Sequence, residues 1–398
     1  MESMSEAAKL LGSEPIAESG LERVVARWGG RRPGPMIVCV TTLHGNEPAG
    51  LRASRRVAET LRGHDVELRG EFVALAGNLQ ALAQHRRYIR EDLNRMWWPE
   101  RVEALRHVRR PLMDEEREMM ELLGQLEALA EQARGPVYFL DLHTTSADGA
   151  PFAAIEDTLA IRQLAFRFPI PVILGIEEEI GGALMEYLAG RGHCCLTFEG
   201  GQHESEGAVD NHESLIWIAL KICGLIAEDG QHEVNRHVQR LIRECSGIPT
   251  AFEIRYRHAI GPQDQFKMLP GMRNFQKVKR GQVVAYDRRG PVRSPKSGRI
   301  VMPLYQEQGE DGFFLGREFN PLWLKFSALL RNLRLGRFTH WMPGVKRHPD
   351  QRKGNLGWMI VNPGIARWFA VEVFHLLGYR RHPPEGKYLV FSRRPFDR

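Results

Sequence analysis

The 398-residue sequence predicts an α/β protein: a mixed, largely parallel sheet with helices on both faces, followed by a small β domain and a basic C-terminal extension. Over the first two thirds, continuous apolar runs rich in β-branched residues alternate with segments of helical periodicity. After about residue 250 the runs become short and are punctuated by Gly and Pro, which indicates the β domain. Residues 320–398 are basic and rich in aromatic side chains.

The first strand–helix unit is expected at residues 35–63. The run PMIVCV at 35–40 has the length of a strand buried on both faces, and AGLRASRRVAETLRG follows as a helix with Pro48 near its start. EFVALAGN at 71–78 and PVYFLDLH at 136–143 are further strand candidates. Between them a helix is expected to begin with Asp114 as its capping residue.

Two later segments complete the predicted α/β part. CCLTF at 194–198 is a short strand, and residues 212–227 form a helix whose apolar face belongs to the core. We therefore divide the chain into a catalytic α/β domain at 1–248, a small β domain at 249–319 and a basic, aromatic-rich extension at 320–398.

Composition and cysteine usage restrict the class of protein. No apolar run approaches the ~20 residues that a membrane-spanning helix needs. The start, MESMSEAAKLLGSEP, is acidic and lacks the basic and apolar regions of a secretory signal. The five cysteines are odd in number and include an adjacent pair, which favours free thiols. We expect a cytoplasmic protein.

The pattern His-x-x-Glu, a common spacing for metal ligands, occurs four times. The histidines are His44, His64, His203 and His382. Only His44 follows a predicted buried strand, in the turn TTLHGNEPAG, where open α/β sheets place their sites. The other three stand in charged loops or beside a Pro pair, and we expect their side chains to be solvated.

Two other predicted strands lead to polar residues of the same kinds. One strand ends at His143 in DLHTT, and another ends at Glu199 in FEGG. The carboxyl ends of parallel strands lie at the same edge of a sheet. We therefore expect His44, Glu47, His143 and Glu199 to converge there. Two histidines and one carboxylate suit a catalytic zinc site with an open water position, and a further carboxylate suits a general base.

The residues between these ligands form an arginine-rich segment that ends in RRYIREDLNRMWW. It contains Arg87, Arg90 and Arg95, together with Asn94. Beside a metal, an arginine is suited to forked recognition of a carboxylate and to stabilising an oxyanion.

In this order, HGNEPAG, RRYIREDLNRMW, DLHTT and FEGG resemble the succinylglutamate desuccinylase/aspartoacylase family, which is related to the zinc carboxypeptidases. The resemblance implies a zinc-carboxypeptidase-like fold and one zinc ion per chain, held by His44, Glu47 and His143. It further implies that Glu199 activates water, that Arg87 polarises the scissile carbonyl, and that Asn94 and Arg95 bind a substrate carboxylate. The implied activity is that of a zinc-dependent deacylase that hydrolyses the amide of a small, anionic N-acyl amino acid.

The resemblance leaves several points open. Relatives have a Tyr and an Arg ahead of the catalytic Glu, and here Tyr187 and Arg191 are the candidates, at a spacing that cannot be equated with theirs. The alternatives are a zinc-carboxypeptidase-like peptidase and a non-catalytic binding protein. The acyl group, the amino acid and the oligomeric state, including a homo-oligomer, are not identified by the sequence.

The extension carries most of the basic charge. Residues 320–398 contain 15 Lys and Arg against 4 Asp and Glu, whereas residues 1–319 contain 40 against 45. In the extension a predicted helix has Lys325, Arg331, Arg334 and Arg337 outside an apolar face of Leu322, Trp323, Phe326, Leu329, Leu330 and Leu333. We expect this face to pack on the catalytic body. Contact with an anionic membrane or with nucleic acid is a less favoured alternative.

Overall fold

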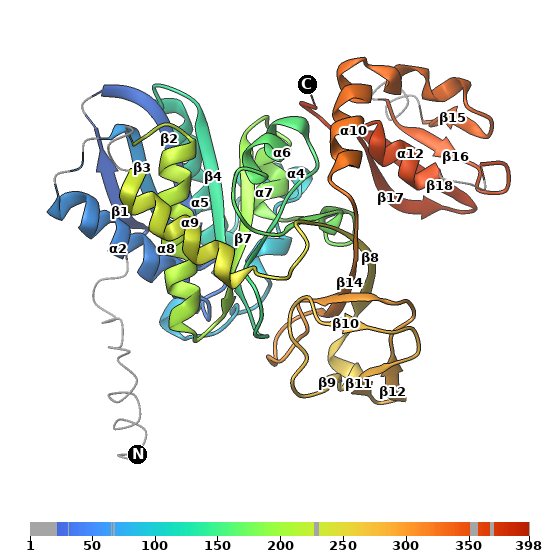
Figure 1. The fold of residues 1–398 in the computed structure, drawn as a ribbon, viewed down its shortest axis with the longest axis horizontal. Coiled ribbons are helices and arrows are strands. Elements are labelled where there is room, and N and C mark those ends of the chain that lie inside the picture. Colours follow the sequence, from blue (N-terminus) through green and yellow to red (C-terminus); the bar gives the residue numbers. More distant parts are fainter. Residues whose placement is uncertain are drawn as a thin grey trace.

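The computed structural model describes residues 22–30, 32–64, 66, 68–226, 231–350, 357–366 and 370–397. Within these residues the strands form an 11-stranded sheet, a 3-stranded sheet and a 4-stranded sheet (Figure 1). The acidic start considered above lies outside the described residues. The predicted α/β class is confirmed, since helices pack on a large mixed sheet and a separate small sheet follows.

The large sheet has the strand order β1-β3-β2-β4-β7-β5-β6-β8-β14-β13-β10. Strands β3, β2, β4 and β7 are mutually parallel, and β5 joins β7 in the antiparallel direction. The bounds are β1 (Val24–Gly29), β2 (Arg32–Thr41), β3 (Arg69–Ala76), β4 (Val137–Thr145), β5 (Phe152–Ala154), β6 (Val172–Leu174), β7 (Cys194–Gln202), β8 (Ala251–Ala259), β10 (Lys277–Val278), β13 (Gly298–Val301) and β14 (Asp311–Glu318).

The four predicted strands are confirmed as β2, β3, β4 and β7. Their apolar continuity has a physical reason, since a strand with both faces covered needs apolar side chains at every position. In β2, for example, Ile37, Val38 and Val40 have no solvent exposure. Strands β4 and β7 run further than predicted, so His143 lies inside its strand rather than at its end, and Glu199 lies inside its strand rather than just after it.

The helices of the catalytic body lie between these strands in sequence. Helix α8 contacts both α2 and α9, and Figure 1 shows α8 and α9 in front of the sheet. The bounds are α2 (Ala49–Gly63), α3 (Leu79–Ala83), α4 (Pro99–Arg106), α5 (Asp114–Gln132), α6 (Leu159–Ala165), α7 (Leu184–Ala189), α8 (Glu206–Ile222) and α9 (Gln231–Glu244).

Two predicted helix boundaries are wrong. The capping residue of α5 is Met113, and Asp114 is the first helical residue, where its charge favours the helix N-terminus without a capping bond. The helix predicted at 212–227 is α8, which begins at Glu206 because Ser205 accepts a hydrogen bond from the Gly207 N–H.

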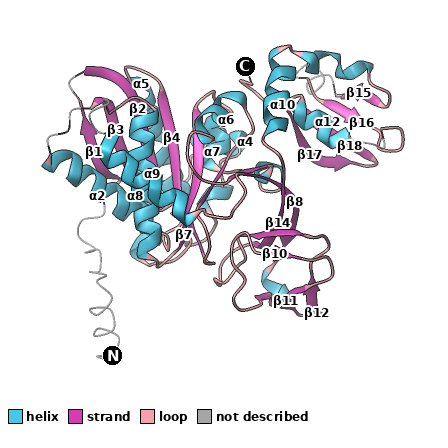
Figure 2. Cartoon of the chain, in the orientation of Figure 1, coloured by secondary structure: helices cyan, strands magenta, loops and turns pink. Residues whose placement is uncertain are grey.

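The β-rich segment after residue 250 extends from the edge of the large sheet. Strands β8 and β14 lead into it, and β9 (Lys267–Met268), β11 (Val283–Asp287) and β12 (Gly290–Arg293) form the 3-stranded sheet. Figure 2 shows it as a separate lobe of strands and loops. Its buried side chains, including Val284, Ile300 and Phe313, form a core cluster of their own. Because β8, β10, β13 and β14 also belong to the large sheet, the division at residue 249 stays a prediction.

The C-terminal segment forms its own α/β layer. It contains α10 (Leu322–Asn332), a 3-10 helix (Leu335–Trp341), α12 (Ala370–Leu376) and an antiparallel sheet of β15 (Val345–Arg347), β16 (Met359–Val361), β18 (Tyr388–Arg393) and β17 (Tyr379–Glu385). Phe374, Tyr379 and Phe391 are buried in its core.

The expected packing of α10 is wrong. Leu322, Trp323, Phe326, Leu329 and Leu333 are 45–62% exposed, and Leu330 is only half-buried. The buried residues of the helix are instead Ser327 and Arg331. The side of the helix with Ser327 and Arg331 therefore packs inward, and Leu324 is partly buried against the core. Lys325 and Arg334 stay exposed, and the predicted apolar face lies open. The proposed contacts of this segment with a membrane or with nucleic acid stay predictions.

The inward packing of Arg331 has an electrostatic cause. Its guanidinium donates to Asp157 Oδ2 at 2.8 Å, to Asp397 at 3.3 Å and to the His375 carbonyl oxygen at 2.7 Å. With its donors satisfied, a buried arginine is compensated, and losing one partner would leave an unpaired buried charge.

A second set of ion pairs joins the C-terminal segment to residues 177–186. Arg394 contacts Glu177 at 2.8 Å, and Arg380 contacts Glu186 at 2.5 Å. His375 lies 3.1 Å from Glu178 and 3.2 Å from Glu253. Three of the basic residues of the extension, Arg331, Arg380 and Arg394, are therefore paired with carboxylates inside the molecule.

The described helices and the cysteines bear on the predicted class of protein. In the part of the chain that the structure describes, every helix is too short or too polar to cross a membrane. All five cysteines are free.

We predict that docking of the C-terminal segment weakens at alkaline pH. Burial lowers the pKa of His375, but Glu178 and Glu253 outweigh this and raise it from 6.5 to about 9. The contribution of His375 to stability is therefore complete below pH 6.5 and is lost as the pH rises through about 9. The loss corresponds to roughly 3 kcal/mol. Urea unfolding at pH 6.5 and 9.5 should show this loss, and His375→Gln should remove it.

The control is His107→Gln, because His107 forms an exposed pair with Glu103. Equal pH dependence of His375→Gln and the unmodified chain would contradict the prediction.

Candidate metal and active site

His44 and Glu47 lie in the turn that follows β2. The Glu47 N–H donates to the His44 carbonyl oxygen at 3.1 Å, which places both side chains on one side of the turn. Gly45 between them is required, since a Cβ there would lie 2.1 Å from the carbonyl carbon of Ala81. The turn is thus pressed against α3, and the spacing His-Gly-x-Glu has a steric reason.

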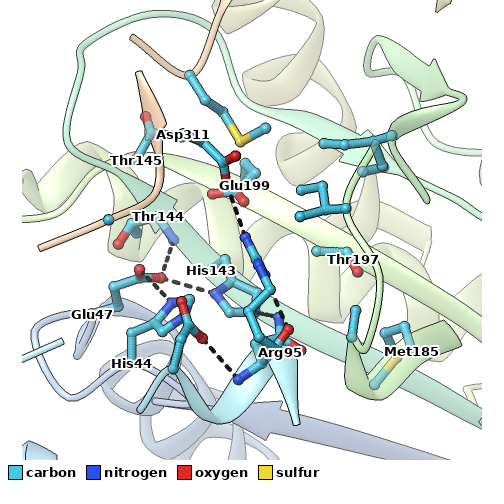
Figure 3. Close-up of a pocket in the computed structure, with 18 of the residues that line it drawn as sticks. His44, Glu47, Arg95, His143, Thr144, Thr145, Met185, Thr197, Glu199 and Asp311 are labelled. Carbon is cyan, nitrogen blue, oxygen red and sulfur yellow. Dashed lines mark hydrogen bonds and ion pairs between the residues drawn. The ribbon is translucent and has the colours of Figure 1, made fainter. Parts of the chain in front are cut away.

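The Glu47 carboxylate joins the two histidines. Its Oε1 is 2.8 Å from His44 Nδ1, and its Oε2 is 3.0 Å from His143 Nδ1. The Thr144 N–H donates to the same Oε2 at 2.8 Å. All three side chains are at most 5% exposed. Figure 3 shows His44, Glu47 and His143 directed at one another, although the first two come from the turn after β2 and His143 comes from β4.

The other nitrogen of each histidine faces a second carboxylate. His44 Nε2 lies 3.1 Å from Asp92 Oδ1, and His143 Nε2 lies 2.8 Å from Asp141 Oδ2. Burial lowers the pKa of His143, but Asp141 and Glu47 outweigh it and hold that pKa well above its usual range. Burial raises the pKa of Asp92, whereas His44 and Arg87 hold it well below its usual range.

This donor set fits a metal ion. One ligand atom from each of His44, Glu47 and His143 lies within 4.8 Å of the others, and no other such group occurs among the described residues. Both histidines direct Nδ1 to the shared point, while their Nε2 atoms are fixed by carboxylates. Metal-binding histidines commonly have such an outer carboxylate, which orients the ring. Sequence reasoning placed these three side chains together correctly.

Glu199 lies beside this cluster on β7. It is the register partner of His143 on β4, so the two side chains are neighbours across parallel strands. Its Oε2 is buried without a hydrogen-bond partner in the described part of the chain. Burial, reinforced by Glu47 and Asp141, raises the pKa of Glu199 to about 8. An unpaired carboxylate next to a metal-type donor set is available for proton transfer.

Arg87 reaches the cluster from the segment between α3 and the 3-10 helix Leu93–Arg95. Its Nη2 donates to Asp92 at 3.0 Å, and its Nη1 donates to Glu47 at 3.4 Å. The segment is fixed by buried Glu115 of α5, whose carboxylate accepts the Ile89 N–H at 2.6 Å. The guanidinium is 13% exposed, so it faces the pocket from a fixed backbone.

Asn94 and Arg95 also line the pocket, but their surroundings differ. The Asn94 Oδ1 accepts the Leu184 N–H at 2.9 Å, and its Nδ2 is 3.3 Å from His143 Nε2. Arg95 is 21% exposed, and its Nη2 donates to Asp311 at 3.1 Å. Arg95 is thus the more accessible of the two, and Figure 3 shows its side chain extended toward Asp311.

Tyr187 and Arg191 lie outside the pocket, whereas His203 lies in it. Tyr187 packs on Trp97, and the Arg191 guanidinium stacks on the Tyr187 ring at 4.4 Å. Neither residue is among those that line the pocket. The predicted solvation of His203 is wrong, because it lies 2.7 Å from Thr144 Oγ1 and 3.0 Å from Gln306 and lines the pocket.

His382 is also misassigned, since its ring stacks on Trp358 at 4.2 Å and bonds to Ser392. Only His64 of the three is exposed as predicted.

Sequence reasoning missed several residues at the site. Asp141 was detectable, because it stands two positions before His143 and therefore on the same face of β4. Gln306 and Asp311 gave no sequence signal, since they reach the pocket from the β-rich segment across more than 200 positions of sequence.

Comparison with known proteins agrees with this geometry. Residues 33–213 match the family model of the succinylglutamate desuccinylase/aspartoacylase catalytic domain, which confirms the resemblance seen in the motifs. No curated protein matches the chain at a significant level.

Several solved structures share the fold at low sequence identity. The product-bound ectoine utilization protein EutE (DoeB) from Ruegeria pomeroyi has a TM-score of 0.53 at 17% identity, and the match covers 73% of this chain and 87% of that one. A succinylglutamate desuccinylase/aspartoacylase from Rhodobacter sphaeroides gives the same values. A succinylglutamate desuccinylase from Silicibacter sp. TM1040 has a TM-score of 0.52 at 16% identity, covering 72% of this chain and 86% of that one.

Proposed function

We propose that this chain, which carries a succinylglutamate desuccinylase/aspartoacylase catalytic domain over residues 33–213, is a zinc-dependent hydrolase that cleaves the amide bond of a small N-acyl amino acid. The observation that carries the proposal is the buried cluster of His44, Glu47 and His143 with Glu199 beside it. We further propose a cytoplasmic location, on the strength of the free cysteines.

The three buried side chains would hold one zinc ion per chain. Nitrogen and carboxylate ligands in a set of three leave a position for water, as in catalytic zinc sites. A bound zinc would lower the pKa of that water toward neutrality and polarise a carbonyl oxygen. Asp92 and Asp141 would keep the two imidazoles oriented.

The protein's own groups then perform the proton transfer. Glu199 accepts the proton of the attacking water and passes it to the departing amine nitrogen. Arg87 donates hydrogen bonds to the carbonyl oxygen, on which negative charge grows as the carbon becomes tetrahedral. Its contacts with Asp92 and Glu47 hold the guanidinium ready for this role.

Substrate recognition is proposed for Asn94 and Arg95. Arg95 is partly exposed in the pocket and suits the carboxylate of an anionic N-acyl amino acid, with Asp311 orienting its guanidinium. Asn94 would assist from the side of His143.

The alternatives account for less of the site. A zinc-carboxypeptidase-like peptidase would use the same metal ligands and base, so the size of the substrate distinguishes it. A binding protein that uses its C-terminal segment on a membrane or nucleic acid would leave the buried cluster and Glu199 without a role. The exposed apolar face of α10 permits a surface contact in addition to catalysis, so the two functions do not exclude each other.

We predict that the purified chain binds one zinc ion and that His143→Ala loses both metal and hydrolysis. Removing one of three protein ligands leaves too few donors to hold the ion. Elemental analysis and amine release from a panel of N-acyl amino acids would measure the two effects. His64→Ala is the matched control, because this exposed histidine has the same His-x-x-Glu spacing. Full zinc occupancy in His143→Ala would refute the ligand assignment.

Glu199→Gln should keep its zinc while kcat falls by at least ~100-fold, the usual contribution of a general base. The substitution is isosteric and removes only the ability to accept a proton. Steady-state kinetics after a zinc determination would test this. Loss of zinc from the variant would make Glu199 a ligand and contradict its proposed role.

The two arginines should affect different kinetic constants. Arg87→Ala is expected to lower kcat, because its partner charge develops only in the transition state. Arg95→Ala should mainly raise KM, because the substrate carboxylate is charged throughout the reaction. Arg109→Ala, at an exposed position, is the control. Constants within about twofold of wild type in both variants would remove the arginines from the site.

A further inference from the structure

The pocket extends from Glu199 along two paired strands. On β7, Glu199, Thr197 and Cys195 alternate on one face, and Phe152 and Ala154 of β5 stand opposite Glu199 and Thr197. Glu156, two residues after Ala154, also lines the pocket. At about 3.3 Å per extended residue, the row from Phe152 to Glu156 is up to about 13 Å long. Figure 3 shows Thr197 and Met185 on the side of the pocket away from Glu47.

We call this part of the pocket, from Glu199 to Glu156, the channel. Its walls leave room for a linear chain. Ala154 and Thr197 are small, and Ile176, Ile180 and Met185 supply apolar surface. Such a lining accepts methylene groups and offers them few polar partners.

The far end of the channel holds three carboxylates, of which two already have a cation. Glu177 contacts Arg394 at 2.8 Å, and Glu186 contacts Arg380 at 2.5 Å. Neither arginine lines the pocket. Glu156 differs from both, because it forms no direct ion pair in the described part of the chain. Its Oε2 is also buried without a hydrogen-bond partner there, as are the two Glu177 oxygens. Burial raises the pKa of Glu156 to about 7, although Arg394 and Arg380 lower it from a distance, so this carboxyl is partly ionised at neutral pH and has no direct cationic partner.

We propose that Glu156 binds the terminal ammonium group of the substrate's side chain, so that the substrate class is an N-acyl diamino acid with a side chain about as long as that of lysine. The inference rests on the proposed hydrolase function. A buried carboxylate without a partner is costly, and a charge-assisted hydrogen bond from an ammonium removes that cost. The substrate would place its carboxylate at Arg95, its amide beside Glu199 and its methylene groups between Ala154 and Ile180.

The C-terminal segment has a defined part in this arrangement. Arg380 and Arg394 come from β17 and from the residue after β18, and they compensate the charges of Glu186 and Glu177 from behind the pocket wall. They thereby leave Glu156 as the one carboxylate of the three without a direct ion pair in the described structure.

The test uses the full zinc-loaded chain and three substrates: Nα-acetyl-L-lysine, its neutral analogue Nα-acetyl-L-norleucine, and Nα-acetyl-L-glutamate. The lysine derivative should have a kcat/KM at least about tenfold above the other two, which is the usual contribution of a hydrogen bond to a charged group. Glu156→Gln should bring the lysine-to-norleucine ratio close to one, mainly through a higher KM for the lysine derivative. Glu131→Gln, at an exposed position on α5, should leave the ratio unchanged.

The outcomes separate the two proposals. A preference for the norleucine or glutamate derivative, or an unchanged ratio in Glu156→Gln, would overturn the role of Glu156 while leaving the hydrolase intact. If no amide is hydrolysed, the proposed function fails. Calorimetric binding of L-lysine against L-norleucine then tests Glu156 alone: selective L-lysine binding that Glu156→Gln abolishes supports the proposal, and its absence overturns it.

Discussion

The site depends on a single carboxylate, that of Glu47. Its two oxygens face the Nδ1 atoms of His44 and His143 from a position that is 2% exposed. A carboxylate buried this deeply must have its charge compensated, and here histidines and the Thr144 N–H do so. The turn at Gly45, the register of β4 on β2 and the positions of Asp92 and Asp141 all bring the partners of this cluster together. A metal ion at the centre would replace the contacts between ligands with contacts to itself.

The second constraint is electrostatic and lies at the C-terminal segment. The sequence segregates charge, with basic residues after 320 and an acidic excess before. In the folded chain Arg331, Arg380 and Arg394 face Asp157, Glu186 and Glu177, so opposite charges meet at the contact between these parts. The pair of Arg331 with Asp157 explains why α10 turns the Arg331 side of the helix inward. The apolar face left outside presents several large exposed side chains together, a feature typical of interaction surfaces.

The parts of the structure that the sequence predicted are those with strong local patterns. The runs that became β2, β3, β4 and β7 are apolar at consecutive positions, and position at strand ends was enough to bring His44, Glu47, His143 and Glu199 together. The orientation of α10 was not predictable, because helical periodicity shows two faces but not the partner of each. Pairing of Arg331 with Asp157 depends on a contact across 174 positions of sequence.

The same limit applies within the site. Glu156 looks like an ordinary acidic residue in the sequence. Its proposed role depends on the pairing of β5 with β7 and on Arg380 and Arg394, which pair with the neighbouring carboxylates. Asp311 and Gln306 enter the pocket from the β-rich segment for a similar reason. Local sequence patterns indicate which residues can take part in catalysis. Long-range packing determines which groups line the rest of the pocket and therefore which substrate it accepts.

The central claim is that His44, Glu47 and His143 form one metal centre, and X-ray absorption at the zinc edge of the zinc-loaded chain tests it most directly. We predict first-shell scattering from nitrogen and oxygen alone, at about 2.0–2.2 Å, with the outer-shell pattern of two imidazoles. A sulfur scatterer near ~2.3 Å, or a spectrum with fewer than two imidazoles, would contradict the assignment of this cluster as the metal site.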